Sequence, residues 1–241
     1  MTTVQEHYAQ VLADVYSWMF GGFEPAIRKN LEFFKQYNIS PRESGVAIDL
    51  GAGCGFQSIP LAQIGFAVTA IDLEQKLLNE LKENSGKSNI KTIQDDLINF
   101  DRYIDSKPEL IVCMTDTILH LESKDRVNFL FQKVFSSLED KGRFVITLRD
   151  LSHELSELER FITVKSDENM IFTCFLEYEP NTVKVHDIIY KKNGSSWKHK
   201  KSFYRKLRLS KQWVEKQLED IGFSKIESSI DNGLITVVVT K

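Results

Sequence analysis

Residues 46–57 read VAIDLGAGCGFQ, and this stretch decides the fold. The first five residues are apolar apart from Asp49, a pattern typical of a strand that is buried on both faces. Glycines 51, 53 and 55 follow, where glycine permits positive φ and lets a ligand approach the main chain closely. The start of the next helix exposes unpaired N–H groups that suit a carboxylate or polar ligand. The stretch predicts a strand, a ligand-binding loop and a helix.

Short apolar runs continue on the C-terminal side of this loop and alternate with amphipathic segments. One such segment, Ser123–Leu138, has a capping serine at its start and Gly142 after its end, as expected of a helix. Apolar strands separated by helices are the signature of a parallel sheet covered on both faces. We therefore expect a doubly wound α/β fold with strands at residues 46–50, 68–71, 90–93, 110–114 and 144–148.

The remaining regions predict additions to this sheet. Residues 4–40 have the periodicity of two helices, separated at Gly21-Gly22. Turn residues separate three further extended segments, which predict an antiparallel β insertion after the fifth strand. A helix from Ser210 to Gly222 and a terminal hairpin complete an expected seven-stranded, mostly parallel sheet. We expect one domain, residues 1–241, with a helical cover (1–40) and an antiparallel cap (170–209, strands at 171–178, 183–191 and 197–209).

Composition narrows the functional class. The chain has 241 residues, of which 42% are hydrophobic and 27% charged, and a formal net charge of −3, so no global basic field points to nucleic acid or membrane. Cys54, Cys113 and Cys174 form no CxxC pair, which argues against a disulfide framework or a zinc site. The N-terminus does not have the pattern of a signal peptide, and the apolar runs are too short to span a bilayer. We expect a soluble, cytoplasmic protein without a metal.

The glycine spacing separates two classes of nucleotide ligand. A dinucleotide fingerprint requires G-x-G-x-x-G. Counting from Gly51, its last position falls on Phe56, which is too large; counting from Gly53, it falls on Ser58, a disfavoured register that remains open. The loop reads more naturally as D-x-G-x-G-x-G and thus resembles the first motif of class I S-adenosylmethionine-dependent methyltransferases. The resemblance implies that Gly51, Ala52, Gly53 and Gly55 wrap the methionine and ribose of the cofactor, and that Asp49 holds its amino acid end.

Acidic residues follow the next two strands. Asp72-Leu73 ends the second strand, about twenty residues after the loop, where a carboxylate can accept hydrogen bonds from both ribose hydroxyls. Dinucleotide enzymes also use an acid there, so Asp72 indicates a nucleoside without selecting the cofactor. After the third strand, the resemblance implies an acidic residue that meets the adenine amino group. Asp96-Leu97 matches the family's usual form, while Asp95 contacts solvent or caps the next turn.

The segment after the fourth strand, MTDTILHL (114–121), borders the transferable methyl group according to the same resemblance, and Thr115 lies on its cofactor side. Methyl transfer needs an aligned nucleophile, and a base if the acceptor carries a proton. His120 is the candidate base; the alternative is a structural histidine packed at a helix start. Asp116 is a candidate for orienting an amine or hydroxyl, or else a turn aspartate.

Other candidates would contact the acceptor. Arg149 and Asp150 follow the fifth strand, where an arginine can grip a carboxylate or phosphate; alternatively the two residues pair with each other and pin the insertion. Aromatic residues in the N-terminal helices either form a lid, as in many small-molecule relatives, or belong to the core. These residues are Tyr8, Tyr16 and Trp18.

A basic run extends through the insertion from Lys191 to Lys211, and Tyr204 and Arg205 within it are further candidates for the acceptor site. A solvated outer face of the antiparallel sheet explains the run best, ahead of an anionic substrate and of RNA. No nucleic-acid methylation signature is present, since residues 115–118 are not Pro-Pro-aromatic and Cys113 follows valine. We therefore expect methyl transfer to a small-molecule nitrogen or oxygen by a monomer or homodimer. A nicotinamide-dependent oxidoreductase and a non-catalytic S-adenosylmethionine-binding protein are the alternatives.

Overall fold

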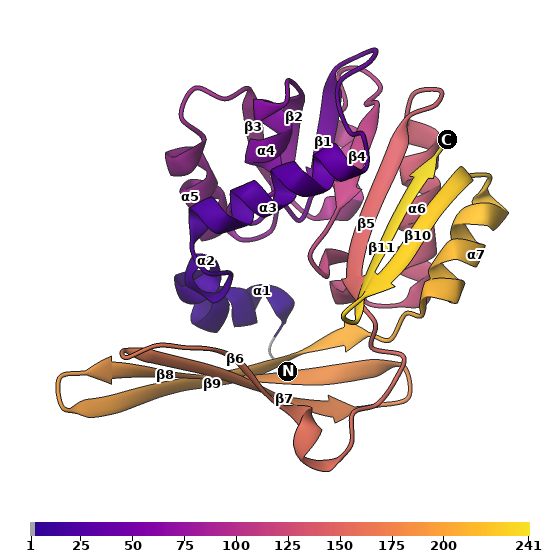
Figure 1. The fold of residues 1–241 in the computed structure, drawn as a ribbon. Coiled ribbons are helices and arrows are strands. Elements are labelled where there is room, and N and C mark those ends of the chain that lie inside the picture. The colour runs from indigo at the N-terminus through magenta and orange to yellow at the C-terminus, as the bar shows by residue number, and fades with distance from the viewer. Residues whose placement is uncertain (1–2) are drawn as a thin grey trace.

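The computed structural model describes residues 3–241 and contains two sheets (Figure 1). The larger sheet has seven strands in the order β10-β11-β5-β4-β1-β2-β3. All neighbours in it run parallel except β11, which is antiparallel to both β5 and β10. This confirms the expected doubly wound sheet, whose strands are β1 (Val46–Leu50), β2 (Ala67–Asp72), β3 (Ile90–Gln94), β4 (Leu110–Cys113), β5 (Arg143–Arg149), β10 (Ser224–Asp231) and β11 (Leu234–Thr240).

Helices cover both faces of this sheet because side chains alternate along each strand. Ala47 and Val112 point to the face on which Phe34 of α3 packs, whereas Ile48 and Ile111 point to the face covered by α6 and α7. None of the helices in the described part of the chain is long and apolar enough to cross a bilayer. The helices that flank the sheet are α3 (Phe23–Gln36), α4 (Ser58–Gln63), α5 (Gln75–Ser85), α6 (Lys124–Ser137) and α7 (Lys211–Ile221).

The second sheet is a cap of four antiparallel strands, one more than expected, and it begins at residue 161 and not at 170. Its order is β6-β7-β8-β9, and its strands are β6 (Phe161–Ser166), β7 (Met170–Tyr178), β8 (Thr182–Asn193) and β9 (Ser196–Leu207). The sequence analysis missed β6 because it is an edge strand with little apolar signal; Phe161 is 63% exposed. The expected third strand also ends at Leu207, earlier than residue 209.

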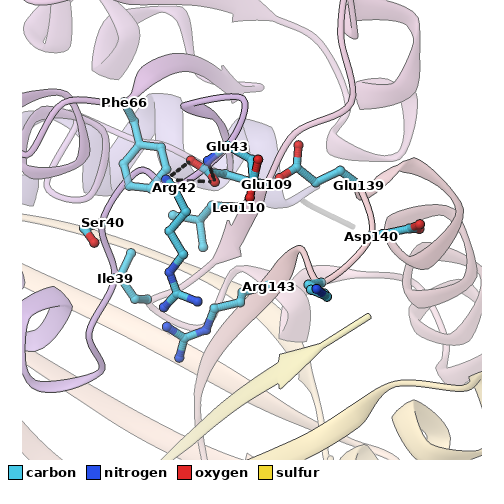
Figure 2. Close-up of a pocket in the computed structure, with 11 residues that line it drawn as sticks. Ile39, Ser40, Arg42, Glu43, Phe66, Glu109, Leu110, Glu139, Asp140 and Arg143 are labelled. Carbon is cyan, nitrogen blue, oxygen red and sulfur yellow. Dashed lines mark hydrogen bonds between the residues drawn. The ribbon is translucent and has the colours of Figure 1, made fainter.

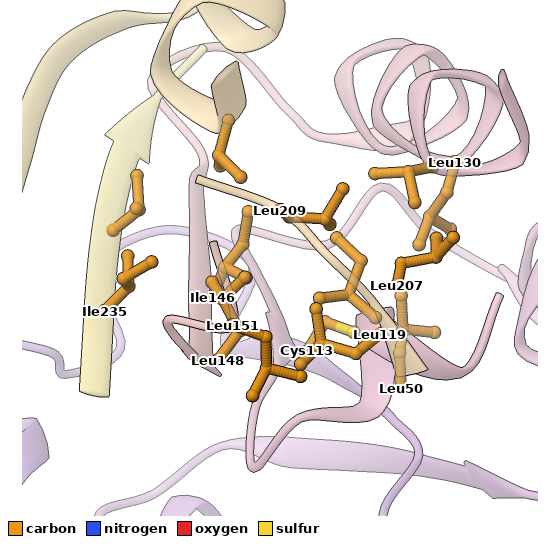
Figure 3. Packing of buried hydrophobic residues seen from close by; sticks show 14 of the residues in the cluster. Leu50, Cys113, Leu119, Leu130, Ile146, Leu148, Leu151, Leu207, Leu209 and Ile235 are labelled. Atoms are coloured by element: carbon orange, nitrogen blue, oxygen red, sulfur yellow. The ribbon is translucent and has the colours of Figure 1, made fainter. Parts of the chain in front are cut away.

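The cap is joined to the main sheet through a shared core. Leu207 and Leu209, where the chain leaves β9, are buried in the same cluster as Cys113 and Leu148 of the main sheet (Figure 3). Burying two leucines contributes roughly 1.5–3 kcal/mol each. The cap therefore has a fixed attachment at this end.

The N-terminal segment differs from the regular helix expected before Gly21. It consists of α1 (Val4–His7), a π-helical turn η1 (Tyr8–Leu12), a 3₁₀ turn η2 (Ala13–Val15) and α2 (Tyr16–Met19). A regular helix turns about 100° per residue, so residues two apart point in nearly opposite directions. Val11 and Ala13 are nevertheless both buried, because the segment lies between the main sheet and the cap. The irregular turns bury apolar side chains on more than one side.

Gly51 offers a test of how tightly the loop after β1 is packed. Its φ is +75°, and an added Cβ would lie 2.2 Å from Cγ2 of Thr117. We expect Gly51→Ala to lower the free energy of unfolding by about 2–5 kcal/mol, from backbone strain plus overpacking. Gly194→Ala is the matched control, since Gly194 has a φ of +63° but an added Cβ would have no atom within 4 Å. It should lower the free energy of unfolding by about 1–2 kcal/mol. Urea unfolding measures the free energy of unfolding of both variants. An equal decrease in the two would contradict the tight packing of Gly51 against Thr117.

Candidate functional site

The loop between β1 and α4 lies at the carboxyl edge of the main sheet and is fixed by the end of β2. The main-chain N–H groups of Gly51 and Ala52 donate to the carbonyl of Ile71 at 2.8 and 3.0 Å. Gly53 donates its N–H to Oδ2 of Asp72 at 2.8 Å. The glycine loop and the acid after the second strand are thus brought together, as the sequence predicted.

The three glycines have different reasons to lack a side chain. An added Cβ at Gly51 would meet Thr117, and one at Gly55 would lie 2.7 Å from Leu81, so both allow close packing within the protein. A Cβ at Gly53 would lie 3.7 Å from the ring of Tyr16 in the N-terminal segment. Only Gly53 therefore borders the space between the loop and that segment.

Two desolvated carboxyl groups flank the loop. Asp49 is buried, accepts a hydrogen bond from Oγ of Ser58 at 2.6 Å, and has a pKa that burial raises to about 7. Burial also raises the pKa of Asp72, although its oxygens accept the main-chain N–H groups of Gly53 and Glu74. A nearby positive charge would compensate both carboxylates, so this part of the site favours a cationic ligand.

Both aspartates after β3 have local hydrogen-bond partners, and the capping role considered for Asp95 belongs to Asp96. Asp96, not Asp95, caps the following 3₁₀ helix (Leu97–Tyr103), because its Oδ1 accepts the N–H of Ile98 at 2.9 Å. Asp95 accepts from the hydroxyl of Tyr103 at 2.6 Å and from Asn99 at 2.9 Å. These hydrogen bonds lower the pKa of Asp95, which argues for a structural role for its carboxylate.

Between these acids and the loop, Leu73 is 39% exposed. Its carbonyl accepts a hydrogen bond from the side chain of Gln94 at 3.1 Å. Leu73 thus offers an apolar surface beside Asp72, at the edge of the sheet.

The chain after β4 contains two consecutive strained residues. Thr115 and Asp116 have φ of +59° and +69°, a region that costs a residue with a side chain about 1–3 kcal/mol. Thr147 of β5 holds both, since its Oγ1 accepts the N–H of Thr115 at 2.8 Å and its carbonyl accepts that of Asp116 at 3.1 Å. The side chain of Gln57 also donates to Oγ1 of Thr115 at 3.0 Å, which links this turn to the glycine loop.

Asp116 joins three strands through its carboxylate. Oδ1 accepts the main-chain N–H of Arg149 at 2.7 Å, and Oδ2 lies 2.6 Å from Nζ of Lys206 on β9 and 3.4 Å from Nε of Arg149. Burial raises the pKa of Asp116, but Lys206 and Arg149 outweigh it and the net pKa is lowered. The carboxylate is therefore an anion engaged by the protein itself, closer to the structural alternative than to a group that orients an acceptor.

Arg149 and Asp150 do not form the ion pair considered for them. The side chain of Arg149 is 64% exposed and faces Asp116. Asp150 instead accepts hydrogen bonds from the N–H and hydroxyl of Ser152 at 3.0 and 2.5 Å. The two side chains lie apart because adjacent residues on an extended chain point to opposite sides.

His120 lies in an aromatic cluster that the N-terminal segment and the cap share. Its Nε2 is 3.5 Å from the hydroxyl of Tyr8, and its ring centroid is 5.3 Å from that of Tyr204. Tyr8 is in turn 6.1 Å from Tyr16, which covers Gly53. The cluster therefore brings together His120, Tyr8, Tyr16 and Tyr204 from three distant parts of the sequence.

The environment of His120 keeps its ring neutral. Burial, together with the charge of Lys206, lowers the pKa of His120 to about 3. Within the described part of the chain its Nδ1 is buried and has no hydrogen-bond partner. A neutral imidazole with a free nitrogen can accept a hydrogen bond from a bound molecule.

Two of the candidate residues lie away from this cluster. Trp18 donates its indole N–H to Asp167 of the β6–β7 turn at 2.5 Å. Arg205 points to the opposite face of β9 from Tyr204, where its Nε lies 2.8 Å from Glu179. Each side chain is directed to a carboxylate of the cap, and its contact with an acceptor stays a prediction.

Sequence analysis missed a buried pair beside the cluster. His7 and Asp187 are 0% and 2% exposed, with Nε2 and Oδ2 2.9 Å apart, and the ring of His7 is 4.4 Å from that of Tyr204. The available signal was Asp187 itself, an acid between Val185 and Ile189 at an inward position of β8. Such a position needs a partner, but the partner is 180 residues away.

The larger of two described pockets, about 470 Å³, lies at the opposite edge of the sheet (Figure 2). It borders the first residues of β4 and β5, Leu110 and Arg143. The carboxylate of Glu109 there accepts the main-chain N–H groups of Arg42, Glu43 and Gly45 at 2.9–3.1 Å. These bonds hold the entry to β1, and ligands in open α/β sheets bind at the other edge.

Comparisons with known proteins agree with this geometry. Residues 47–142 match a family model described as a methyltransferase domain. Glycine/sarcosine N-methyltransferase of Halorhodospira halochloris is 24% identical over 82% of this chain and 72% of its own. An S-adenosylmethionine-dependent methyltransferase of Clostridium acetobutylicum has a TM-score of 0.73 at 18% identity, covering 90% of this chain and 91% of that one.

The sugar N-methyltransferase KedS8 of Streptoalloteichus sp. has a TM-score of 0.72 at 12% identity, covering 95% and 93% of the two chains. The fold of each of these two structures matches that of this chain. Residues 47–142 therefore match a methyltransferase domain, and the fold of the chain is that of a solved S-adenosylmethionine-dependent methyltransferase.

Proposed function

We propose that this chain transfers the methyl group of S-adenosylmethionine to a small molecule that carries an amine or hydroxyl. The observation that carries the proposal is the enclosed cluster of His120, Tyr8 and Tyr204 beside the glycine loop. The N-terminal segment and the cap both contribute to it, which suits a small acceptor better than a polymer. The core shared by cap and main sheet supports treating residues 1–241 as one domain.

The residues around the loop fit the cofactor. S-adenosylmethionine is a sulfonium with an amino acid end and a nucleoside, and the desolvated carboxyls of Asp49 and Asp72 would compensate its positive charges. Asp72 would accept from the ribose hydroxyls, the family resemblance assigns the adenine amino group to Asp96, and Gly53 allows close approach. When bound, the cofactor supplies an electrophilic methyl group.

The protein's own groups then position the acceptor. The bound cofactor would supply its methyl group as the electrophile: the acceptor's nitrogen or oxygen would bond to the methyl carbon while the carbon–sulfur bond breaks, and the positive charge would pass to the acceptor. Neutral His120 accepts a hydrogen bond from the acceptor's N–H or O–H and directs the lone pair toward the methyl group. Its lowered pKa makes it an orienting acceptor of hydrogen bonds, and the released proton passes on to solvent.

A nitrogen acceptor has the stronger support. The relatives described above include a glycine/sarcosine N-methyltransferase and a sugar N-methyltransferase. The aromatic rings of the cluster also suit the cationic product of amine methylation. Hydroxyl methylation uses the same geometry and remains the second candidate.

The oxidoreductase alternative has a steric objection. Phe56 occupies the last position of the dinucleotide fingerprint counted from Gly51, is 4% exposed and stacks on Tyr16 at 6.0 Å. The direct test is calorimetric titration of the purified chain with S-adenosylhomocysteine and with NADH. We expect binding of S-adenosylhomocysteine only. Binding of NADH alone would contradict the proposal.

Asp72→Asn should weaken binding of S-adenosylhomocysteine by about 1–3 kcal/mol, because a neutral amide replaces a carboxylate that accepts from ribose hydroxyls. Asp105→Asn is the matched control, since that side chain is 94% exposed and lies away from the loop. Calorimetry measures both affinities. An unchanged affinity in Asp72→Asn would remove Asp72 from the cofactor site.

The raised pKa of Asp49 predicts a pH dependence of cofactor binding. Above about pH 7 the carboxylate is ionised and attracts the ligand's ammonium group; below it, the group is neutral. Affinity for S-adenosylhomocysteine should therefore fall as pH decreases from 8 to 5.5, by at most about tenfold per unit. In Asp49→Asn this dependence should flatten, and a pH profile that the substitution leaves unaltered would contradict the assignment.

His120→Asn should reduce kcat by about 10²-fold, because the orienting imidazole is lost. Binding of S-adenosylhomocysteine should remain within about twofold of the parent, since His120 faces the acceptor. His199→Asn, on the exposed hairpin of the cap, serves as the control. The activity assay uses an acceptor found by screening small amines for methylation; equal kcat in parent and variant would exclude His120 from positioning it.

A further inference from the structure

A second pocket, of about 280 Å³, lies between the N-terminal segment and the hairpin of β8 and β9. Its apolar lining comes from both sides: Val11 and Val15 from the segment, Ile189 and Met170 from the cap. Its remaining lining is almost entirely basic. Besides Asn193 and Asp14, the polar lining residues are Lys191, Lys192, Lys198 and Lys200.

Most of these exposed lysines have no acidic partner in the described part of the chain. Lys191 on β8 is directly opposite Lys198 on β9, and like charges in that position destabilise a strand pair. No ion pair within residues 3–241 involves Lys191, Lys192 or Lys198. The sequence contains no Asp or Glu from residue 188 to 214, and Asp14 is already shared between Lys76 and Lys200.

The pocket and the aromatic cluster lie on the same face of the strand pair β8–β9. Alternation along β8 places Val185, Asp187, Ile189 and Lys191 on the face directed at the N-terminal segment, and Tyr204 is opposite Val185 on β9. The lysine pair is thus six residues beyond Tyr204 along β9, roughly 20 Å at about 3.4 Å per residue. The pocket is a separate site on the same face of the cap.

We propose that this pocket binds an amphipathic anion, with a carboxylate or phosphate on the lysines and an apolar chain against Val11, Val15, Met170 and Ile189. The volume corresponds to about nine groups of the size of water, at roughly 30 Å³ each. A carboxylate with about eight carbons fills it. Because its walls belong to the N-terminal segment and the cap, the bound molecule holds these two parts together.

The test is calorimetric titration of the full chain with octanoate, 1-octanol and octylammonium. We expect saturable binding of octanoate at least tenfold tighter than of either other compound. Octyl phosphate in place of octanoate distinguishes a phosphate from a carboxylate headgroup. Equal affinity for octanoate and 1-octanol, or no binding of any anion, would overturn the proposal.

Variants locate the site. K191Q with K198Q should reduce octanoate affinity at least tenfold, and Met170→Glu should do the same by placing a negative charge at the apolar wall. The control pair, K201Q with K87Q, removes the same charge: Lys201 lies on the other face of β9, opposite Ile188, and Lys87 is exposed after α5. Loss of binding in the control pair as well would indicate general charge attraction and contradict the pocket.

Sedimentation with vesicles of phosphatidylcholine and phosphatidylserine examines the rival explanation of these lysines, a membrane surface. We expect no sedimentation at physiological salt. Vesicle binding that K191Q/K198Q abolishes, without octanoate binding, would overturn the small-molecule site. Titration with S-adenosylhomocysteine in every variant monitors the methyltransferase site independently, so that failure of one proposal leaves the other intact.

Discussion

The interaction of the Asp116 carboxylate with β5 and Lys206 is the one on which the position of the cap over the site depends. The carboxylate is buried at the end of β4 and joins the main chain of β5 to Lys206 on β9. Removing one partner of a buried ion pair typically costs about 3–5 kcal/mol, since the other charge is left uncompensated. The strained backbone at Thr115 and Asp116 is held by β5, so the main sheet itself sets where the cap can lie.

The enclosure also explains the electrostatics around the loop. The same burial that raises the pKa of Asp49 and Asp72 lowers that of His120. Removing water disfavours every charged form, whichever its sign. A cation near Asp49 and Asp72 would stabilise their ionised forms, which burial disfavours. A sulfonium cofactor would supply such a charge.

The main sheet could be predicted because its signals are local. Buried strands such as Val46–Leu50 are apolar throughout, and the glycine loop and Asp72 have fixed spacing along the chain. The acceptor side could not be predicted to the same extent. His7 and Asp187 are partners only because the N-terminal segment and β8 meet in space, and β6 is too exposed to show a strand pattern.

The direction of a side chain decides which candidate residues lie in the cluster around His120. The choice between Tyr204 and Arg205 depends on which face of β9 meets the body of the protein, and the sequence of that strand is basic on both faces. Similarly, Tyr16 and Trp18 are two residues apart in α2 and point in nearly opposite directions, but the irregular turns before α2 decide which of them faces the glycine loop and which faces Asp167. Neither direction is specified by local periodicity.

The irregular N-terminal segment has a consequence for how molecules enter and leave. The ring of Tyr16 lies next to Gly53, so a nucleoside that approaches the loop at this glycine meets that ring. The segment is held by buried apolar residues such as Val11 and Leu12 and by the polar pairs of His7 with Asp187 and Trp18 with Asp167. Access to the loop at Gly53 therefore depends on the N-terminal segment, whereas the sheet that carries the loop can stay in place.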